Sequence, residues 1–189
     1  TGAFADSKQI SSINLPSSLL YLGDWAFAGA VSNTAINISE GLKAIGAFSF
    51  TKNSKVTSIR IPNSVISIND EAFSNLSELS SLVIGDGVKS IGKRAFADNP
   101  KLSNVVFGKA LENIGEESFA NNSSLTSITL GSSTKYIGRK AFSSLPKLKT
   151  AVFPEGLLEI GSEAFRNNGA LTSINLPSTL TSIGDYAFS

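Results

Sequence analysis

Residues 171–188 read LTSINLPSTLTSIGDYAF and residues 56–73 read VTSIRIPNSVISINDEAF, and the same pattern recurs along the whole chain with a 23-residue period. Phenylalanines mark the period without any insertion. They are Phe4, Phe27, Phe50, Phe73, Phe96, Phe119, Phe142, Phe165 and Phe188. A fixed period of this length is the signature of a solenoid, in which successive units stack and bury one continuous core.

Each unit carries a strand signal and a turn signal. Apolar residues six, nine and eleven positions after the phenylalanine, as in Leu171, Ile174 and Leu176, predict a short strand that a proline or glycine ends. An Ile-Gly pair follows, with Asn69 replacing the glycine in one unit. Because glycine and asparagine both enter the left-handed region, we expect a positive φ at this position. The small residue before the next phenylalanine predicts a tight helical turn.

One unit buries too little apolar surface to offset the entropy lost when its backbone and side chains become ordered, so it is stable only in an array. We therefore predict a β-rich leucine-rich repeat solenoid in which residues 1–189 form a single domain of about eight repeats. Its strands are parallel, its turns are short and helical or irregular, and the array is curved. Both ends of the sequence stop in mid-pattern without a polar capping repeat. We therefore expect this domain to be a fragment of a longer protein.

Composition excludes several classes of function. The 16 basic and 15 acidic residues give a net charge of +1, too little to attract nucleic acid. No apolar run approaches the roughly 18 residues that cross a bilayer, so we expect no direct membrane insertion. The chain has neither cysteine nor histidine, which removes disulfides and the usual ligands of zinc, copper and haem. We predict no metal and no cofactor.

The two stretches quoted above resemble the BspA-type, or Treponema-type, leucine-rich repeats of bacterial and protozoan surface proteins, over essentially the whole chain. That family often carries cysteine three residues after the phenylalanine. This chain instead has Ser7, Ala30, Asn53, Leu76, Asn99, Asn122, Leu145 and Asn168. The departure favours an exported protein of a Gram-positive bacterium. The chain is also similar to a pneumococcal choline-binding adhesin. That resemblance implies a virulence-related role in adhesion to host epithelial cells, with cell-wall choline bound only by a module outside this chain.

Two motifs that suggest catalysis coincide with repeat positions. The string GVKSIGKR, residues 87–94, lacks the final hydroxyl of a phosphate-binding loop, and Gly92 already belongs to the Ile-Gly pair. The neighbouring carboxylates Glu116 and Glu117 occupy two positions whose charge alternates from one unit to the next. We therefore predict a ladder of opposite charges there and no catalytic residue.

The candidate binding residues lie on the outward face of the first strand. Side chains eight and ten positions after each phenylalanine point away from the core, and most of them are small and polar. The second of these positions holds Arg60, Val83, Val106, Thr129 and Val152 in consecutive units. An apolar stripe of this kind marks a docking surface. The alternative is that β-branched residues stand there only because they favour strands.

Aromatic residues two positions before the repeat phenylalanine occur near both ends, at Trp25, Phe48 and Tyr186. Packing against neighbouring segments and ligand stacking both account for them. For the whole domain, the leading hypothesis is a non-catalytic, protein-binding module on a bacterial cell surface. It would contact a host cell-surface or extracellular protein. A structural spacer that presents another domain is the alternative, and a glycan-active enzyme finds no carboxylate pair outside the repeat pattern.

Overall fold

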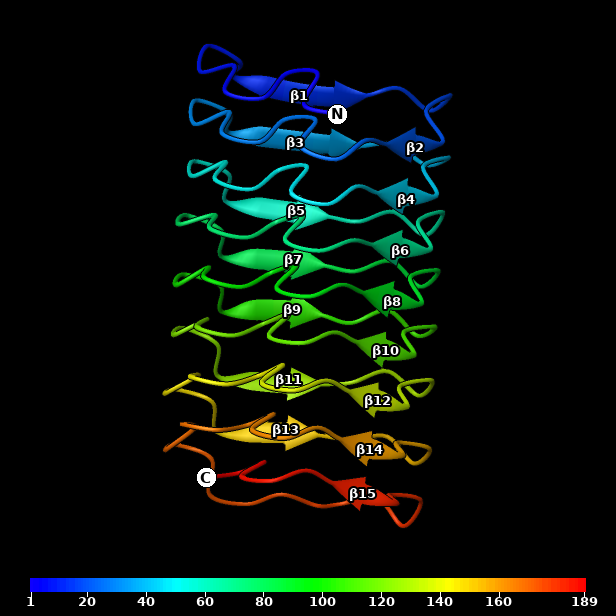
Figure 1. Ribbon diagram of the computed structural model, residues 1–189, viewed down its shortest axis with the longest axis vertical. Coiled ribbons are helices and arrows are strands. Elements are labelled where there is room, and N and C mark those ends of the chain that lie inside the picture. Colours follow the sequence, from blue (N-terminus) through cyan, green and yellow to red (C-terminus); the bar gives the residue numbers. More distant parts are fainter.

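The computed structural model describes residues 1–189 and is a solenoid of short parallel strands with no helix. Each 23-residue unit makes one turn, and the turns stack along the long axis of the molecule (Figure 1). The first strands of successive turns are β1 (Ser12–Leu15), β3 (Ala35–Ile38), β5 (Ser58–Arg60), β7 (Ser81–Val83), β9 (Asn104–Val106), β11 (Ser127–Thr129) and β13 (Thr150–Val152). The second strands are β2 (Tyr21–Leu22), β4 (Ala44–Ile45), β6 (Ser67–Ile68), β8 (Ser90–Ile91), β10 (Asn113–Ile114), β12 (Tyr136–Ile137), β14 (Glu159–Ile160) and β15 (Ser182–Ile183).

Both sets of strands pair in parallel with the equivalent residues of the next turn, but only one set is continuous. The second strands form one eight-stranded sheet from β2 to β15. The first strands are divided, with interruptions between β3 and β5 and between β9 and β11. In the last turn the corresponding residues, 173–175, form no strand. The shorter strands therefore provide the unbroken hydrogen-bonded ladder.

The repeat phenylalanines form a stack through the core from Phe4 to Phe188. Consecutive rings are nearly parallel, and the centroid distances run from 5.1 Å for the first pair to 5.7 Å for the second and 5.2 Å for the last. The six rings from Phe50 to Phe165 are fully buried. Around them, the apolar strand residues predicted from the sequence form one continuous hydrophobic cluster. The predicted solenoid of 23-residue repeats is confirmed.

Two larger side chains accompany breaks in the first-strand ladder. Phe107 and Phe153 stand eleven positions after a repeat phenylalanine, where most turns have leucine or isoleucine. The Phe107 ring meets Phe119 and Phe142 edge-on, at centroid distances of 5.3 and 6.2 Å, and so reaches two successive turns. The ladder is interrupted directly after β9, and no first strand follows β13. The interruption between β3 and β5 has no such ring beside it, so ring volume does not account for every break.

The glycines of the Ile-Gly pairs are explained by close packing and not by the predicted positive φ. Gly46, Gly92 and Gly115 do not have a positive φ, so that expectation was wrong. A Cβ atom on Gly115 would lie 2.6 Å from the carbonyl oxygen of Ile91, and one on Gly46 would lie 2.5 Å from the carbonyl carbon of Gly23. Glycine is favoured here because the backbone of the preceding turn approaches this position closely, although Asn69 occupies it in one turn.

The left-handed residues stand instead two positions before and two positions after each repeat phenylalanine. Among them, Glu71 has a φ of 51° and Asn75 a φ of 59°. The amide of Glu71 donates to the carbonyl of Lys93 over 2.8 Å, and that of Asn75 to the carbonyl of Ala97 over 3.0 Å. The left-handed conformation thus accompanies hydrogen bonds to the next turn. The predicted helical turn was wrong, because this segment forms irregular turns joined to their neighbours.

Buried asparagines tie the turns together at the position where the family often has cysteine. The Nδ2 of Asn122 donates to the carbonyl oxygens of Phe96 and Phe119, over 3.0 and 2.8 Å. Its Oδ1 accepts a 3.0 Å hydrogen bond from the amide of Asn99. Asn99 makes the same three contacts one turn earlier, to Phe73, Phe96 and Leu76. Each side chain therefore satisfies backbone groups of two turns.

Replacing Asn122 with alanine removes these three hydrogen bonds and leaves the buried amide of Asn99 without a partner. We expect a loss of about 2–4 kcal/mol of unfolding free energy, measured by denaturant unfolding. The control is Asn104→Ala, on an exposed strand position, which should change stability by less than about 0.5 kcal/mol. Equal midpoints for the two variants would contradict the proposed bridging role.

Two buried hydroxyl groups have no hydrogen-bond partner. Ser49 and Ser118 precede the repeat phenylalanine, where other turns have alanine, and both are fully buried. A buried hydroxyl without a partner loses its hydration and gains nothing in return. These two serines are therefore local weak points of the core.

Ser118→Ala should raise the unfolding free energy by about 1 kcal/mol, because it removes an unsatisfied polar atom from a site that accepts alanine elsewhere. Thermal melting checks the shift. Ser74→Ala is the matched control, since the buried Ser74 hydroxyl contacts the carbonyl of Glu71 and the hydroxyl of Thr51. That variant should lose stability. A fall in melting temperature for Ser118→Ala would refute the interpretation.

Candidate binding face

The outward side chains of the first strands form the candidate binding face. The register sets Arg60 of β5 beside Val83 of β7 and Val83 beside Val106 of β9. It likewise sets Thr129 of β11 beside Val152 of β13. The predicted residues therefore occupy one column in consecutive turns, with the ladder interruption between Val106 and Thr129. We call Val83, Val106, Thr129 and Val152 the Val stripe.

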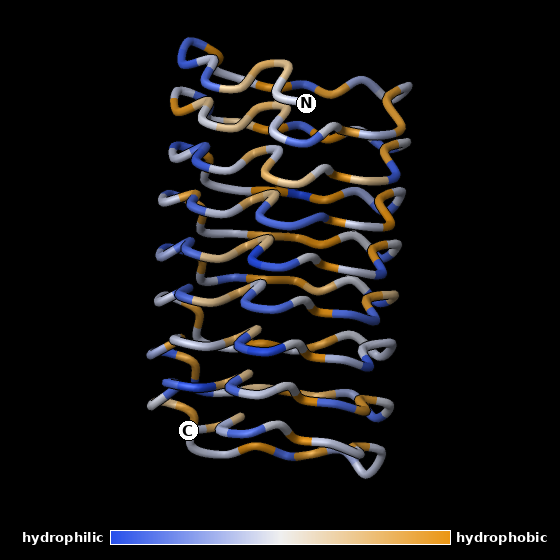
Figure 2. Tube along the Cα trace, viewed as in Figure 1, coloured by the Kyte–Doolittle hydropathy of each residue, from blue (hydrophilic) through white to orange (hydrophobic).

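The Val stripe carries exposed apolar surface. Val106 is 49% exposed and Val152 is 52% exposed, while Val83 is half-buried between its neighbours. In the two N-terminal turns the same column is polar, since it holds Asn14 and Asn37. The Nδ2 of Asn37 donates a 2.7 Å hydrogen bond to the Oδ1 of Asn14. Figure 2 shows how hydrophobic and hydrophilic residues alternate along these strands. The face thus changes from a self-paired polar end to an apolar region.

A column of polar residues runs beside the Val stripe. The column two residues earlier holds Ser81, Asn104, Ser127 and Thr150. In the next column, the hydroxyls of Ser80 and Ser103 contact backbone carbonyls of the preceding turn, over 3.1 and 3.3 Å. These hydroxyls are satisfied within the protein, so covering them with an apolar partner costs little.

Charged residues border this face on both sides. The segments leading into the first strands carry both charges, with Glu78 among the exposed lysines Lys55, Lys101, Lys147 and Lys149. The first three are 46 residues apart (101 − 55 and 147 − 101), which is two turns. Of the four, Lys101 has an ion pair, 2.6 Å from Glu78. Sequence analysis did not single out these charged residues.

On the opposite border, the turns that follow the first strands carry Glu40, Asp86 and Glu155, together with Lys109, which lies 3.5 Å from Asp86. The Glu40 carboxylate accepts hydrogen bonds from the amides of Asn63 and Ser64, over 3.2 and 3.0 Å. Loss of hydration opposes ionisation, but these amides outweigh it and hold the pKa of Glu40 below its ordinary value. Glu40 therefore stays charged at neutral pH.

The predicted charge ladder is present at another corner of the solenoid. Arg94 lies 3.8 Å from Glu71 in the preceding turn and 2.7 Å from Glu117 in the following turn. In the adjacent column, Glu116 lies 3.3 Å from both Lys93 and Arg139. The two neighbouring carboxylates, which a catalytic hypothesis would pair, each bind cations of adjacent turns. The alternation of charge is confirmed, although Lys140 contacts Glu163 rather than Glu117.

The ladder shifts the pKa values of its members toward the charged forms. Burial disfavours the charged guanidinium of Arg94, but the hydrogen bond to Glu117 and the nearby carboxylates outweigh it and raise its pKa. The hydrogen bond from Arg166, together with Arg139 and Lys140, lowers the pKa of Glu163. These groups favour the stacked state at neutral pH.

Reversing both cations of one turn, Lys93→Glu with Arg94→Glu, sets like charges against Glu71, Glu116 and Glu117. We expect a loss of about 1–2 kcal/mol at low salt that shrinks as salt is added, measured by thermal melting. Lys43→Glu with Lys149→Glu makes the same change of net charge at exposed lysines that have no ion pair and no acidic residue at the equivalent position of an adjacent turn. That control should melt close to the wild type, and unchanged melting of the ladder variant would refute the ladder.

The string resembling a phosphate-binding loop is part of the repeat. Ser90 and Ile91 form β8, and Gly92 begins a turn that leads to no helix. A Cβ on Gly92 would lie 2.6 Å from the amide nitrogen of Asp70. This glycine is therefore fixed by packing against the preceding turn.

The terminal aromatic residues lie in different surroundings. Trp25 stacks on Phe48 with a centroid distance of 4.2 Å, so these two pack against each other across successive turns. Tyr186, at the other end, is 73% exposed. Packing of Tyr186 against a further segment stays a prediction.

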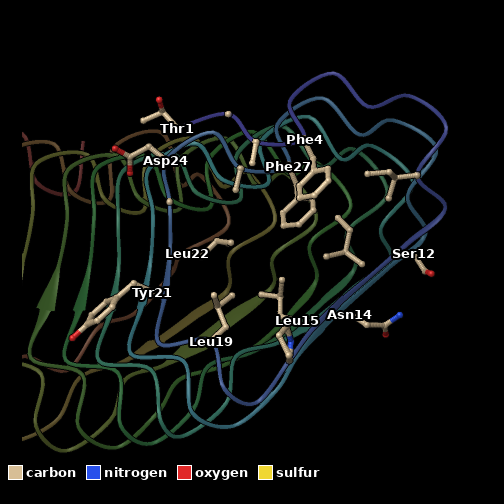
Figure 3. A pocket seen from close by; sticks show the side chains of 17 residues that line it. Thr1, Phe4, Ser12, Asn14, Leu15, Leu19, Tyr21, Leu22, Asp24 and Phe27 are labelled. Atoms are coloured by element: carbon tan, nitrogen blue, oxygen red, sulfur yellow. The ribbon is translucent and has the colours of Figure 1, made fainter.

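The largest cavity, of about 540 Å³, opens at the N-terminal end of the core. Phe4 and Phe27 stack in it, and Leu15, Leu19 and Leu22 point into the same space (Figure 3). Ser12, Asn14 and Tyr21 point outward. The cavity is the open interior of the first turn, and no convergent set of charged groups lines it.

Two further properties concern possible attachments. The chain forms no helix long and apolar enough to cross a membrane. No cluster of three or more acidic side chains is placed to hold a metal ion. The carboxylates and asparagines described above instead bond to residues of an adjacent turn.

Comparison with known proteins identifies the repeat. A model of the BspA-type leucine-rich repeat region matches residues 1–103 and 67–189. No curated protein matches the chain. Among solved structures, the Treponema pallidum leucine-rich repeat protein is 26% identical with a TM-score of 0.71, and the alignment covers 92% of this chain and 73% of that one.

Two other structures share the fold at lower identity. A leucine-rich cell surface protein from Faecalibacterium prausnitzii is 19% identical, with a TM-score of 0.59 and coverage of 97% of this chain and 62% of that one. The pneumococcal vaccine antigen PcpA is 21% identical, with a TM-score of 0.53 and coverage of 94% and 60%. The chain thus spans about six tenths of the length of these two proteins.

Proposed function

Since the chain belongs to the BspA-type leucine-rich repeat family, we propose that it is a non-catalytic protein-binding module of a bacterial surface protein. Its partner would be a host cell-surface or extracellular protein, as expected of an adhesin. The observation that carries this proposal is the Val stripe, because it exposes apolar side chains on a face that is otherwise small and polar. Attachment to cell-wall choline would require a module outside these residues.

The surroundings of the polar residues support a binding role over catalysis. Glu116 and Glu117 bind cations of neighbouring turns, and Asp24 and Asp70 accept hydrogen bonds from the amides of Ala47 and Lys93, both over 2.7 Å. These carboxylates are committed to joining turns. A surface location is part of the proposal, and the Faecalibacterium protein with the same fold is described as a cell surface protein.

A structural spacer is the second candidate, and one observation favours it. At the N-terminal end of this face, outward groups bond within the array, as Asn37 does with Asn14 and Thr34 with the carbonyl of Ser11. Such a surface offers a partner few free polar groups. A spacer would use the array only for its length and would show no saturable binding.

The Val stripe separates the two candidates. We expect Val106→Asp with Val152→Asp to reduce saturable binding of the labelled domain to cultured epithelial cells by at least about 10-fold, because two anchor side chains become charged. Flow cytometry over a concentration series measures the effect.

The matched control is Ile66→Asp, which alters an aliphatic side chain of similar exposure, 47%, beside the second strands. That variant should bind like the wild type, and circular dichroism should show all three proteins folded. Undiminished binding by the double variant would reject the Val stripe as the contact surface. Absence of saturable binding by the wild type would favour the spacer.

A further inference from the structure

We propose that the first corner of the array, residues 2–6, is a slot for the guanidinium group of an arginine side chain, held between Trp25 and Asp6. This inference rests on the proposed binding function, because the arginine would belong to the protein partner. Three observations support it: an aromatic ring with one open face, a carboxylate without a partner, and an arginine at the equivalent position four turns later.

One face of the Trp25 ring has no side chain of its own column against it. The other face stacks on Phe48 of the next turn, with a centroid distance of 4.2 Å and an interplanar angle of 7°. The equivalent residue of the preceding turn is Gly2, which has no side chain, whereas all later turns have a large residue there. Trp25 is accordingly 45% exposed. We call the space above Trp25 the Gly2 slot.

The backbone of the Gly2 slot has the same geometry as the corner that begins at Arg94. The amide of Gly2 donates to the carbonyl of Asp24 over 2.9 Å, and the amide of Arg94 donates to the carbonyl of Glu116 over 2.8 Å. Both residues are left-handed, with φ values of 67° and 53°. The slot therefore reproduces the Arg94 corner without its side chain.

Asp6 places an unpaired carboxylate beside the slot. Its counterpart at the later corner is Asp98, whose Oδ1 accepts a 2.7 Å hydrogen bond from Asn121 and whose Oδ2 pairs with Arg94. The Oδ1 of Asp6 likewise lies over the next turn, since a Cβ on Gly29 would clash with it. Asp6 is exposed and forms no ion pair. Its Oδ2 is thus free to bind a cation in the slot, as the Oδ2 of Asp98 binds Arg94.

The two groups together select a planar cation. Arg94 has Glu117 of the following turn 2.7 Å away, and at the first corner Trp25 takes the place of that carboxylate. A guanidinium stacks on an aromatic face while its edge still donates hydrogen bonds to a carboxylate. An ammonium is more strongly hydrated and is not planar, and a neutral sugar has no charge to pair with Asp6. The slot therefore suits arginine best.

The charges around the slot also favour a cation. Asp24 is exposed next to Trp25, and only its Oδ1 is used, in a 2.7 Å hydrogen bond from the amide of Ala47. Lys8 is the basic residue closest to Asp6 in the sequence, and the two form no ion pair. The two carboxylates outnumber this one cation, so the field at the slot attracts positive charge.

The test observes the indole Nε1–H of Trp25 by NMR, because the chain has one tryptophan and this signal reports on the slot alone. The probe is acetyl-arginine amide, titrated at constant ionic strength into the whole 189-residue chain. Acetylation of Thr1 removes the terminal charge beside Gly2. We expect a saturable shift with a dissociation constant on the order of 1–10 mM. Acetyl-lysine amide and methyl glucoside should bind at least about 3-fold more weakly.

Two variants locate the binding. Gly2→Phe fills the slot, and Phe48 shows that the column accepts this residue with a φ of 56°; it should weaken arginine binding at least about 10-fold. Asp6→Asn should weaken it about 3- to 10-fold at low salt. The control Asp185→Asn removes the same charge from an exposed residue at the other end and should bind like the wild type. Circular dichroism should show all variants folded.

The outcomes separate this inference from the proposed function. Absence of a saturable arginine shift, undiminished binding by Gly2→Phe, or equal binding of acetyl-lysine amide or methyl glucoside overturns the inference. If epithelial-cell binding still depends on the Val stripe in that case, the proposed function stands. If arginine binds in the slot but the wild type shows no saturable cell binding, the slot stands and the adhesion function is rejected.

The same variant tests whether the partner supplies the arginine. Gly2→Phe should reduce saturable binding to epithelial cells by at least about 3-fold, because one contact of the partner is lost. Unchanged cell binding by Gly2→Phe would overturn the assignment of the arginine to the partner.

Discussion

The stacking of each repeat phenylalanine on its counterpart in the next turn is the constraint on which the rest of the structure depends. The ring pairs from Phe4 to Phe188 keep centroid distances between 5.1 and 5.7 Å, close to the separation of adjacent strands in a sheet, about 4.8 Å. Aromatic contact and backbone pairing therefore require almost the same rise per turn. Because both favour one register, a slip of a single residue would break the stack and the second-strand ladder together.

Because all turns share one register, equivalent residues of successive turns form a column. The residues of one column make the same kind of contact in each turn. Glycine after the second strand allows close backbone approach, as at Gly115, and asparagine after the phenylalanine satisfies buried backbone groups, as at Asn122. Carboxylates at other positions accept hydrogen bonds from the next turn, as Asp70 does from the amide of Lys93. Stability is thus distributed as contacts between nearest neighbours, which is the general behaviour of repeat proteins.

The sequence alone predicted what periodicity controls, namely the 23-residue repeat, the strands, the buried columns and the alternating charges around Arg94. It failed where geometry between turns decides the result. The Ile-Gly pair suggested a left-handed turn, but the left-handed residues proved to be ones such as Glu71, which a propensity rule would not select. Asn122 was noted only as a substitution of cysteine, because its hydrogen bonds reach residues 3 and 26 positions away. The positions of the interruptions in the first-strand ladder, such as the one after β9, follow no local sequence pattern.

The division of tasks among columns also explains where a binding surface can arise. Side chains at the corners are committed to the neighbouring turn, and side chains of the core are committed to the stack. The side chain at the tenth position after the phenylalanine belongs to neither group, since it points outward from the first strand. The ladder of these strands is itself interrupted between some turns. This column is free to change from Asn14 and Asn37, which bond to each other, through Arg60 to the exposed Val106 and Val152. A rigid stack with one unconstrained column can therefore acquire a partner through a few outward substitutions, with no change in the contacts that hold the turns together.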